Sequence, residues 1–349
     1  MTKPRILLTY MLRNSFVRRD IESLQQLGYR VDEWQAYPHK RLGFVANRLK
    51  ECFLGIFKVA RATHVVSWFS DYHSFFLLLW ARLMGKPALV IVGGFDAVAA
   101  PHLQYGALLK ANFRRWCIRQ NYRLATQIWV VDTSLAKGCP IARDQQGVLS
   151  GLLPWMPELA PKIQTVPTGY DADFWKPQGP KTPNTVLTVG LFTDLRVAER
   201  KGIPHFLKLA RLWPDFQFTI VGDADQMLSK HYEIPENVAI KGLVDEATLL
   251  ALFQAQEYYA QFSIIEGLPN VLCEAMLCGC IPIGNPVFGI PTAIGSTGML
   301  MDVREMDSQA QRLKEQLAPL QSDPPRARMV QLFTKKQRDT KLKNFIQSK

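Results

Sequence analysis

The stretch Ser263-Ile264-Ile265-Glu266-Gly267-Leu268-Pro269-Asn270-Val271-Leu272-Cys273-Glu274-Ala275-Met276 carries the most informative pattern in the chain. Residues 258–261 before it predict a β-strand, and the residues after Pro269 predict a helix, whose first turn suits a proline. Free backbone N–H groups of Asn270 and Val271 would then favour an anion such as a diphosphate. Glu274 falls within this helix, where a carboxylate can accept hydrogen bonds from the vicinal hydroxyls of a ribose. Two ordinary solvated carboxylates are the alternative interpretation of Glu266 and Glu274.

Strand and helix patterns alternate on both sides of this stretch. In the first half, strands are predicted over residues 5–10, 30–34, 64–67, 88–92 and 127–131, with amphipathic helices between them. In the second half the alternation restarts with strands over 185–189 and 217–221 and helices over 204–212 and 245–256. Such alternation predicts parallel sheets that are covered by helices on both faces.

A chain of 349 residues is longer than one hydrophobic core usually supports, so two domains are expected. Residues 161–183 hold five prolines and two glycines and are interpreted as the linker. We expect an N-terminal domain over residues 1–165 and a C-terminal domain over 166–325. The tail is helical in pattern from Met306, broken at Asp323-Pro324-Pro325, and its last helix, over 326–349, is expected to pack across the domains.

The segment from Glu266 to Met276, EGLPNVLCEAM, resembles a signature of the retaining GT-B glycosyltransferases of the family 4 type, also called group 1. This large family includes the sucrose synthases and bacterial mannosyltransferases, and its E-x7-E element aligns with Glu266 and Glu274. The resemblance implies an α/β fold of GT-B type, with two Rossmann-like domains whose parallel sheets face a central cleft. It also implies that Glu266 binds hydroxyls of the donor sugar as a catalytic residue, and that Glu274 holds the ribose. The donor pocket would include Gly267, Leu268, Pro269, Asn270 and Val271.

A second element that resembles the family is the strand over 185–189, which ends at Gly190 and is followed by Arg200-Lys201-Gly202. The resemblance implies that Gly190 and Lys201 lie at the donor, with the lysine ammonium against the diphosphate. Leu191 stands where the family usually has an arginine. We expect Arg196 to replace that second cation; for Arg196 and Arg200 alike, an exposed loop arginine is the alternative.

The N-terminal half departs further from the family pattern. In the segment Val90-Ile91-Val92-Gly93-Gly94-Phe95-Asp96, Gly93 stands where many members carry a histidine. We expect Asp96 to face the cleft as a catalytic residue and to contact the sugar or the acceptor hydroxyl. His73 and His102 are alternates for proton handling, although a histidine among aromatic residues is more often simply packed.

The positive charge of the chain is concentrated in the first half. Residues 1–165 carry 22 Lys and Arg against 10 Asp and Glu, whereas the remainder carries 20 of each. This excess favours an anionic ligand or surface, with a general contribution to solubility as the alternative. The predicted helix over 40–62 places Lys40, Arg41, Arg48, Lys50, Lys58 and Arg61 among apolar residues, as an interfacial helix does; a solvated helix face is the alternative.

The sequence as a whole predicts a glycosyltransferase of the hexosyltransferase type. It would move a sugar from a UDP- or GDP-linked donor to an acceptor hydroxyl of a glycan or lipid-linked acceptor, in envelope polysaccharide or glycolipid synthesis. No cofactor and no metal are expected, because the six cysteines lack the spacing of metal ligands. No apolar stretch is long enough to span a bilayer, so no transmembrane helix is expected. A cytoplasmic protein is expected, and the positive charge of the first half favours a place at the inner face of the plasma membrane.

Two alternatives remain at this point. The first is a catalytically inactive nucleotide-sugar-binding protein of the same fold, which the residues Gly93 and Leu191 favour. The second is a protein that binds nucleic acid through its basic half, but no nucleic-acid-binding motif is present and no such partner is expected.

Overall fold

The computed structural model describes residues 3–36, 42–317, 320 and 323–348. The chain divides into two compact units. The first, here called the N-terminal unit, consists of Met1–Arg143, Gly147–Gly169 and Lys335–Lys349; the second, the C-terminal unit, consists of Asp144–Gln146 and Tyr170–Thr334. Apart from the short segment Asp144–Gln146, the chain passes from the first unit to the second between Gly169 and Tyr170 and returns to the first unit at Lys335.

The N-terminal unit is built on six parallel strands in the order β2-β1-β3-β4-β6-β8. Their bounds are β1 (Arg5–Tyr10), β2 (Arg30–Gln35), β3 (His64–Trp68), β4 (Ala88–Val92), β6 (Gln127–Val130) and β8 (Ile163–Thr165). The five predicted strands are confirmed. The sixth, β8, lies at the edge of the sheet, within the segment predicted as linker, so that prediction was wrong for residues 163–165. A short antiparallel pair, β5 (Val98–Ala99) and β7 (Leu149–Ser150), lies outside the sheet.

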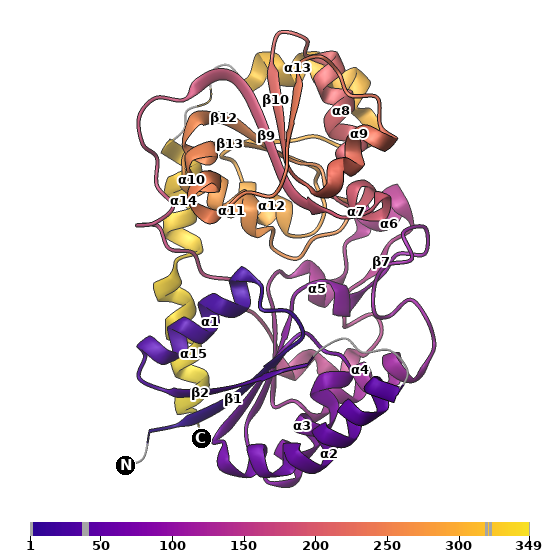
Figure 1. Ribbon diagram of the computed structural model, residues 1–349, viewed down its shortest axis with the longest axis vertical. Coiled ribbons are helices and arrows are strands. Elements are labelled where there is room, and N and C mark those ends of the chain that lie inside the picture. Colours follow the sequence, from indigo (N-terminus) through magenta and orange to yellow (C-terminus); the bar gives the residue numbers. More distant parts are fainter. Residues whose placement is uncertain (1–2, 37–41, 318–319, 321–322, 349) are drawn as a thin grey trace. The chain divides into compact units, whose positions relative to one another are not determined.

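Helices connect these strands and cover the sheet (Figure 1). Asp71 caps α3 with its side chain, and Ser74 completes the capping box. The helices are α1 (Ser15–Gln26), α2 (Leu42–Arg61), α3 (Tyr72–Leu83), α4 (Phe113–Leu124), α5 (Ser134–Lys137) and α15 (Lys335–Gln347), with 3-10 helices at Phe95–Ala97 and Pro157–Lys162. Helix α6 (Pro140–Gln146) begins in this unit, and its last three residues belong to the C-terminal unit.

The C-terminal unit has a second sheet of six parallel strands, in the order β11-β10-β9-β12-β13-β14. The strands are β9 (Thr182–Phe192), β10 (Gln217–Asp223), β11 (Val238–Lys241), β12 (Gln256–Gln261), β13 (Ile281–Gly284) and β14 (Met299–Leu300). The order reverses between β9 and β12, because the chain runs outward from β9 through β10 to β11 and then returns to the other side. In sheets of this kind the crevice for a ligand opens at such a reversal, beyond the carboxyl ends of the strands.

The helices of this unit follow the predicted alternation, including those predicted over 204–212 and 245–256. They are α7 (Leu195–Arg200), α8 (Ile203–Leu212), α9 (Met227–His231), α10 (Glu246–Ala255), α11 (Asn270–Leu277), α12 (Gly289–Ile294), α13 (Met306–Leu317) and α14 (Asp323–Leu332), with 3-10 turns at Ala224–Gln226 and Val303–Glu305. The prolines at 324 and 325 lie in the first turn of α14, where a proline costs no hydrogen bond, so they begin a helix.

The last helix returns to the N-terminal unit and packs beside α1 (Figure 1). Arg338 of α15 forms a buried ion pair with Asp20 of α1, at 2.6 Å, and its guanidinium lies over the ring of Trp129. The indole N–H of Trp68 also donates a hydrogen bond to Asp20. Residues 326–332, predicted to form one helix with this segment, belong instead to α14 in the other unit.

Candidate active site

Two charged side chains meet at the reversal of the second sheet. Lys201 directly follows α7, the helix after β9, and Glu266 lies in the loop after β12. The Nζ of Lys201 lies 2.6 Å from Oε1 of Glu266, and both side chains are largely shielded from solvent. The structure therefore brings together two residues that are 65 positions apart in the sequence.

A glycine fixes the loop that carries Lys201. Gly202 has a positive φ of 78°, and a Cβ atom there would lie 2.1 Å from the carbonyl oxygen of Phe262. The N–H of Ile264 also donates a hydrogen bond to the carbonyl of Arg200. A residue with a side chain at position 202 would force these two loops apart. Because Gly202 has no side chain, the two loops can lie close enough for Lys201 and Glu266 to form their ion pair.

Glu266 accepts hydrogen bonds from three side chains at one carboxylate oxygen. The donors are Lys201, Ser263 at 2.9 Å and Gln261 at 3.3 Å. Burial alone would raise the pKa of Glu266, but the positive charges of Lys201 and Arg200 outweigh it and hold the pKa below its ordinary value. Glu266 is thus ionised at neutral pH and can accept hydrogen bonds from a ligand. Sequence reasoning missed Ser263 and Gln261, although both are polar positions in an otherwise apolar run.

Helix α11 begins directly after this loop, but one residue later than the sequence predicts. Pro269 is the N-cap, just before the first turn, and Asn270 and Val271 are the first two helical residues. The Asn270 side chain accepts a hydrogen bond from the hydroxyl of Tyr170. This contact holds the start of the helix, and Tyr170 is not part of the motif that was predicted to bind the donor. Glu274 lies in the second turn and is buried.

Close backbone packing also holds Gly267 and Leu268. The N–H of Gly289 donates a hydrogen bond to the carbonyl of Gly267, and a Cβ atom on Gly289 would lie 2.1 Å from that oxygen. The side chain of Leu268 is buried. The loop from Glu266 to Pro269 is therefore held between its own helix and the start of α12.

The remaining predicted donor residues lie around the end of β9. Gly190 lies in β9, and the backbone of Gly222 in β10 packs against it. A Cβ atom on Gly222 would lie 1.6 Å from the carbonyl oxygen of Gly190. Leu191 is exposed. Arg196 is also exposed and lies 3.7 Å from Asp194, the N-cap of its own helix, whereas the charge of Arg200 acts on Glu266. The effect of Arg200 on the pKa of Glu266 and the exposure of Arg196 favour Arg200 as the second cation near Glu266.

The burial of Asp96 argues against its predicted contact with a substrate. Its side chain has no exposed surface, and its carboxylate accepts hydrogen bonds from the backbone N–H groups of Ser70, Gly93 and Gly94 and from the hydroxyl of Tyr122. Burial raises the pKa of Asp96 to about 6, against the opposing effect of these donors. The residue holds the loop after β4 in place, which corrects the expectation that it faces a cleft.

The positions of His73 and His102 do not support a role in proton transfer. His73 is buried in α3, and burial lowers its pKa to about 4, so it is neutral at physiological pH. His102 lies in an exposed turn after β5. Within the described residues, no group of three or more His, Cys, Asp or Glu side chains is placed to hold a metal ion.

The predicted basic helix corresponds to α2, Leu42–Arg61, in the N-terminal unit. Lys40 and Arg41 lie outside the described residues. Lys50, Lys58 and Arg61 are exposed, whereas Arg48 points inward and pairs with the buried Glu51. No helix in the described part of the chain is long and apolar enough to cross a membrane.

The chain is similar in sequence to a known protein family and to curated proteins. The family model described as "Glycosyl transferases group 1" matches residues 170–331. Alpha-maltose-1-phosphate synthase from Mycolicibacterium smegmatis is 26% identical over 226 residues, which cover 57% of this chain and 58% of that protein. The chain therefore matches less than two thirds of the length of this curated relative.

Solved structures resemble the chain over nearly its whole length. Sucrose-phosphate synthase from Thermosynechococcus elongatus has a TM-score of 0.71 at 16% identity, with 98% of each chain covered. HepE from Anabaena, in complex with UDP and glucose, has a TM-score of 0.66 at 15% identity, again with 98% of each chain covered. The two Rossmann-like units define a protein of the GT-B fold. The match to the group 1 glycosyl transferase model falls within the C-terminal unit.

Proposed function

We propose that the chain is a retaining glycosyltransferase that moves a hexose from a UDP- or GDP-linked donor to an acceptor hydroxyl, without a metal ion. The observation that carries this proposal is the ion pair of Lys201 and Glu266, which lies at the reversal of the sheet and directly before helix α11. A group of this kind suits a sugar diphosphate, because cation, carboxylate and helix N-terminus lie on adjacent loops.

Each residue has a chemical task in this proposal. Lys201 and the N–H groups at the start of α11 would stabilise the negative charge that develops on the leaving diphosphate. Glu266, ionised because of the neighbouring cations, would accept hydrogen bonds from hydroxyls of the transferred sugar. Glu274, one helical turn further along α11, would hold the ribose. The UDP in the structure of Anabaena HepE supports a nucleoside diphosphate as the leaving group.

The experiment that tests this proposal is thermal stabilisation by UDP, GDP, ADP and their sugars. A ligand at a hundred times its Kd should stabilise the folded protein by about 2.7 kcal/mol. We expect one nucleotide to stabilise the wild type and to stabilise Glu274→Ala weakly. Glu315→Ala, which removes an exposed glutamate of α13, is the matched control and should respond as the wild type does. Absence of any nucleotide response in the wild type would remove the main support for the proposal.

The same samples separate the enzyme from its inactive alternative. Incubation with the nucleotide sugar that binds, together with candidate acceptors, should release the nucleoside diphosphate and keep the configuration at the anomeric carbon. Binding without turnover across the acceptor panel would favour a nucleotide-sugar-binding protein, and a product of opposite configuration would contradict retention.

We further propose a lipid-linked acceptor at the cytoplasmic face of the plasma membrane, in envelope polysaccharide or glycolipid synthesis. The supporting feature is the outer face of α2, on which Val45, Leu49, Phe53 and Phe57 recur every four residues and are each more than half exposed. Four-residue spacing places them in one row along the helix. Exposed cations flank this row, as expected for a helix that lies on an anionic bilayer.

Binding to vesicles tests the membrane proposal independently of catalysis. Wild-type protein should sediment with phosphatidylcholine vesicles that contain phosphatidylglycerol at low salt, and Phe53→Ser/Phe57→Ser should sediment much less. The control Leu243→Ser/Leu300→Ser removes exposed apolar side chains of the other unit and should bind as the wild type does. Equal binding of both double variants would exclude this face of α2 as the membrane contact.

A further inference from the structure

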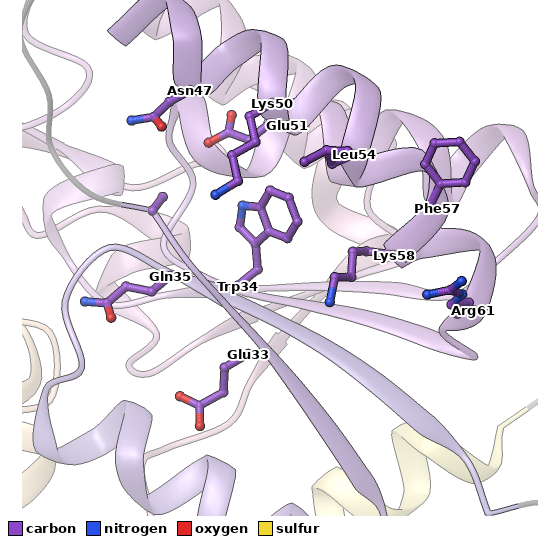
Figure 2. Close-up of a pocket in the computed structure, with 11 residues that line it drawn as sticks. Glu33, Trp34, Gln35, Asn47, Lys50, Glu51, Leu54, Phe57, Lys58 and Arg61 are labelled. Carbon is purple, nitrogen blue, oxygen red and sulfur yellow. The ribbon is translucent and has the colours of Figure 1, made fainter. Parts of the chain in front are cut away.

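A pocket of about 460 Å³ lies between the edge strand β2 and helix α2. Figure 2 shows Trp34 projecting from β2 towards α2, and Lys50, Leu54 and Lys58 projecting from α2 around it. The Nζ of Lys50 lies 5.8 Å from the centre of the Trp34 ring. The pocket belongs to the N-terminal unit alone and is separate from the residues proposed to bind the donor.

The pocket carries a net positive charge, because its two carboxylates already have partners. Glu33 points from β2 away from α2 (Figure 2) and pairs with Arg13 and the hydroxyl of Tyr10. Glu51 is buried and bonded to Arg48, and burial raises its pKa against the positive charge of this arginine.

Three cations at the pocket have no such partner. Lys50, Lys58 and Arg61 are all exposed, and among the described residues none of the three takes part in an ion pair. Lys58 and Arg61 are three positions apart and therefore neighbours on the helix surface. Lys50 lies about 12 Å further along the helix axis, at a rise of about 1.5 Å per residue. This arrangement suits an elongated anion with its strongest charge at the Lys58 end.

We propose that this pocket binds the headgroup of an anionic phospholipid, with the phosphate between Lys58 and Arg61 and the polar end of the headgroup against Trp34 and Lys50. The proposal deepens the membrane part of the proposed function and rests on it. The rim favours a lipid over a soluble phosphate ester, because Phe57 lines the pocket and also belongs to the exposed apolar row of α2. The glycerol and acyl chains would continue from the phosphate along that row.

A charge-neutral substitution distinguishes a pocket from general attraction to an anionic surface. Trp34→Leu keeps every charge but removes the aromatic wall, so it should weaken binding to vesicles of phosphatidylcholine and phosphatidylglycerol by about tenfold, which corresponds to about 1.4 kcal/mol. Trp116→Leu, which removes a half-exposed tryptophan of α4 in the same unit, is the control and should bind as the wild type does.

Loss of charge provides the second comparison. Lys58→Gln/Arg61→Gln should bind these vesicles at least about tenfold more weakly than Lys110→Gln/Lys137→Gln, a double variant with the same loss of charge on exposed residues of the same unit. Glycerophosphoglycerol, the soluble headgroup, should stabilise the wild type thermally but not the Lys58 and Arg61 variant, at matched ionic strength.

The outcomes separate the sources of the phosphate. If Trp34→Leu binds vesicles as the wild type does and both charge variants lose equal affinity, the surface is a general electrostatic one and the pocket proposal is overturned. If the soluble headgroup binds but vesicles do not, the ligand is a free phosphate ester and the lipid assignment is overturned. Stabilisation by UDP or GDP, measured on the same variants, reports on the other unit, so failure here is distinguishable from failure of the donor proposal.

Discussion

Lys201 controls the charge of Glu266, and this contact gives a testable dependence of activity on pH. Without the lysine, burial would dominate and raise the pKa of Glu266. Lys201→Met should therefore move the acidic limb of the pH profile of kcat/KM to higher pH. It should also lower kcat by about 10²–10³ at the optimum, because a charge that stabilises the leaving group is lost.

The control for this prediction is Lys208→Met, since Lys208 pairs with Asp307 on the surface of the same unit. Its pH profile should match that of the wild type. A Lys201→Met enzyme with an unchanged acidic limb would show that Glu266 does not titrate in the rate-limiting step.

Asp96 has the opposite electrostatic balance and predicts an effect on stability. Its pKa in the folded state, about 6, is above the ordinary value of 3.8. Between these values the unfolded chain releases the proton that the folded chain keeps, so this group makes the folded state less stable as pH rises from 3.8 to 6. The size of the effect is about 3 kcal/mol across the window.

Asp96→Asn removes this titration while it keeps an oxygen for the donors of the loop. The free energy of unfolding, measured with urea at several pH values, should differ between variant and wild type by an amount that changes between pH 4 and 6 and is constant above pH 7. A difference that is independent of pH would contradict the raised pKa.

Lys201, Glu266 and Asp96 show which parts of the site can be predicted from the sequence. Lys201 and Glu266 each follow a strand at a position that the alternation of elements reveals, so their convergence at one sheet edge was predictable. The burial of Asp96 was not, because it depends on Ser70 and Tyr122, which lie 26 positions away on either side. Asp96 lies in the 3-10 turn that follows the predicted strand β4, and its carboxylate accepts hydrogen bonds from residues of its own unit.

The loops that carry Lys201 and Glu266 depend on the glycine at position 202. Gly202→Ala would place a methyl group 2.1 Å from the Phe262 carbonyl and force a positive φ on alanine. The backbone strain costs about 1–2 kcal/mol, and the clash adds roughly 1–3 kcal/mol. Donor binding should weaken in addition, because the loop that carries Lys201 must move.

Gly179→Ala provides a close control for this element. Gly179 has a similar φ of 75° in the same unit, but no atom lies within 4 Å of its added methyl group. Its substitution should cost only the backbone strain, as measured by urea unfolding, and should leave nucleotide binding unchanged. Equal effects of the two substitutions would mean that the approach to Phe262 does not position the loop.

Prolines explain why some element boundaries escaped prediction. Pro161 and Pro167 flank β8 and made a short edge strand look like part of a linker. Pro269 and the prolines of α14 instead mark helix starts, where the missing N–H costs nothing. A proline thus marks a boundary reliably, but the element on each side of it depends on partners elsewhere in the chain, such as β6 for β8.

At the level of the whole chain, the return of α15 ties the C-terminus to the first unit through one buried ion pair. The side chains of Arg338 and Asp20 are 2% and 6% exposed, and Arg338 also donates to the carbonyl of Val166, just before the chain enters the second unit. Arg338→Met would leave the carboxylate of Asp20 buried without its cation, which costs about 3–5 kcal/mol in comparable cases. The N-terminal unit should therefore unfold at a lower temperature.

Because Arg338 belongs to the N-terminal unit, its loss should leave the C-terminal unit intact. Hydrogen exchange read by mass spectrometry should show faster exchange in α1, β3 and α15, with exchange in β9 and β12 unchanged. Nucleotide binding by Arg338→Met should likewise equal that of the wild type below the first transition. Asp20→Asn/Arg338→Met, in which no charge is left buried, should recover part of the lost stability. Uniformly faster exchange in both units would show instead that they unfold as one cooperative body, with α15 holding the whole chain together.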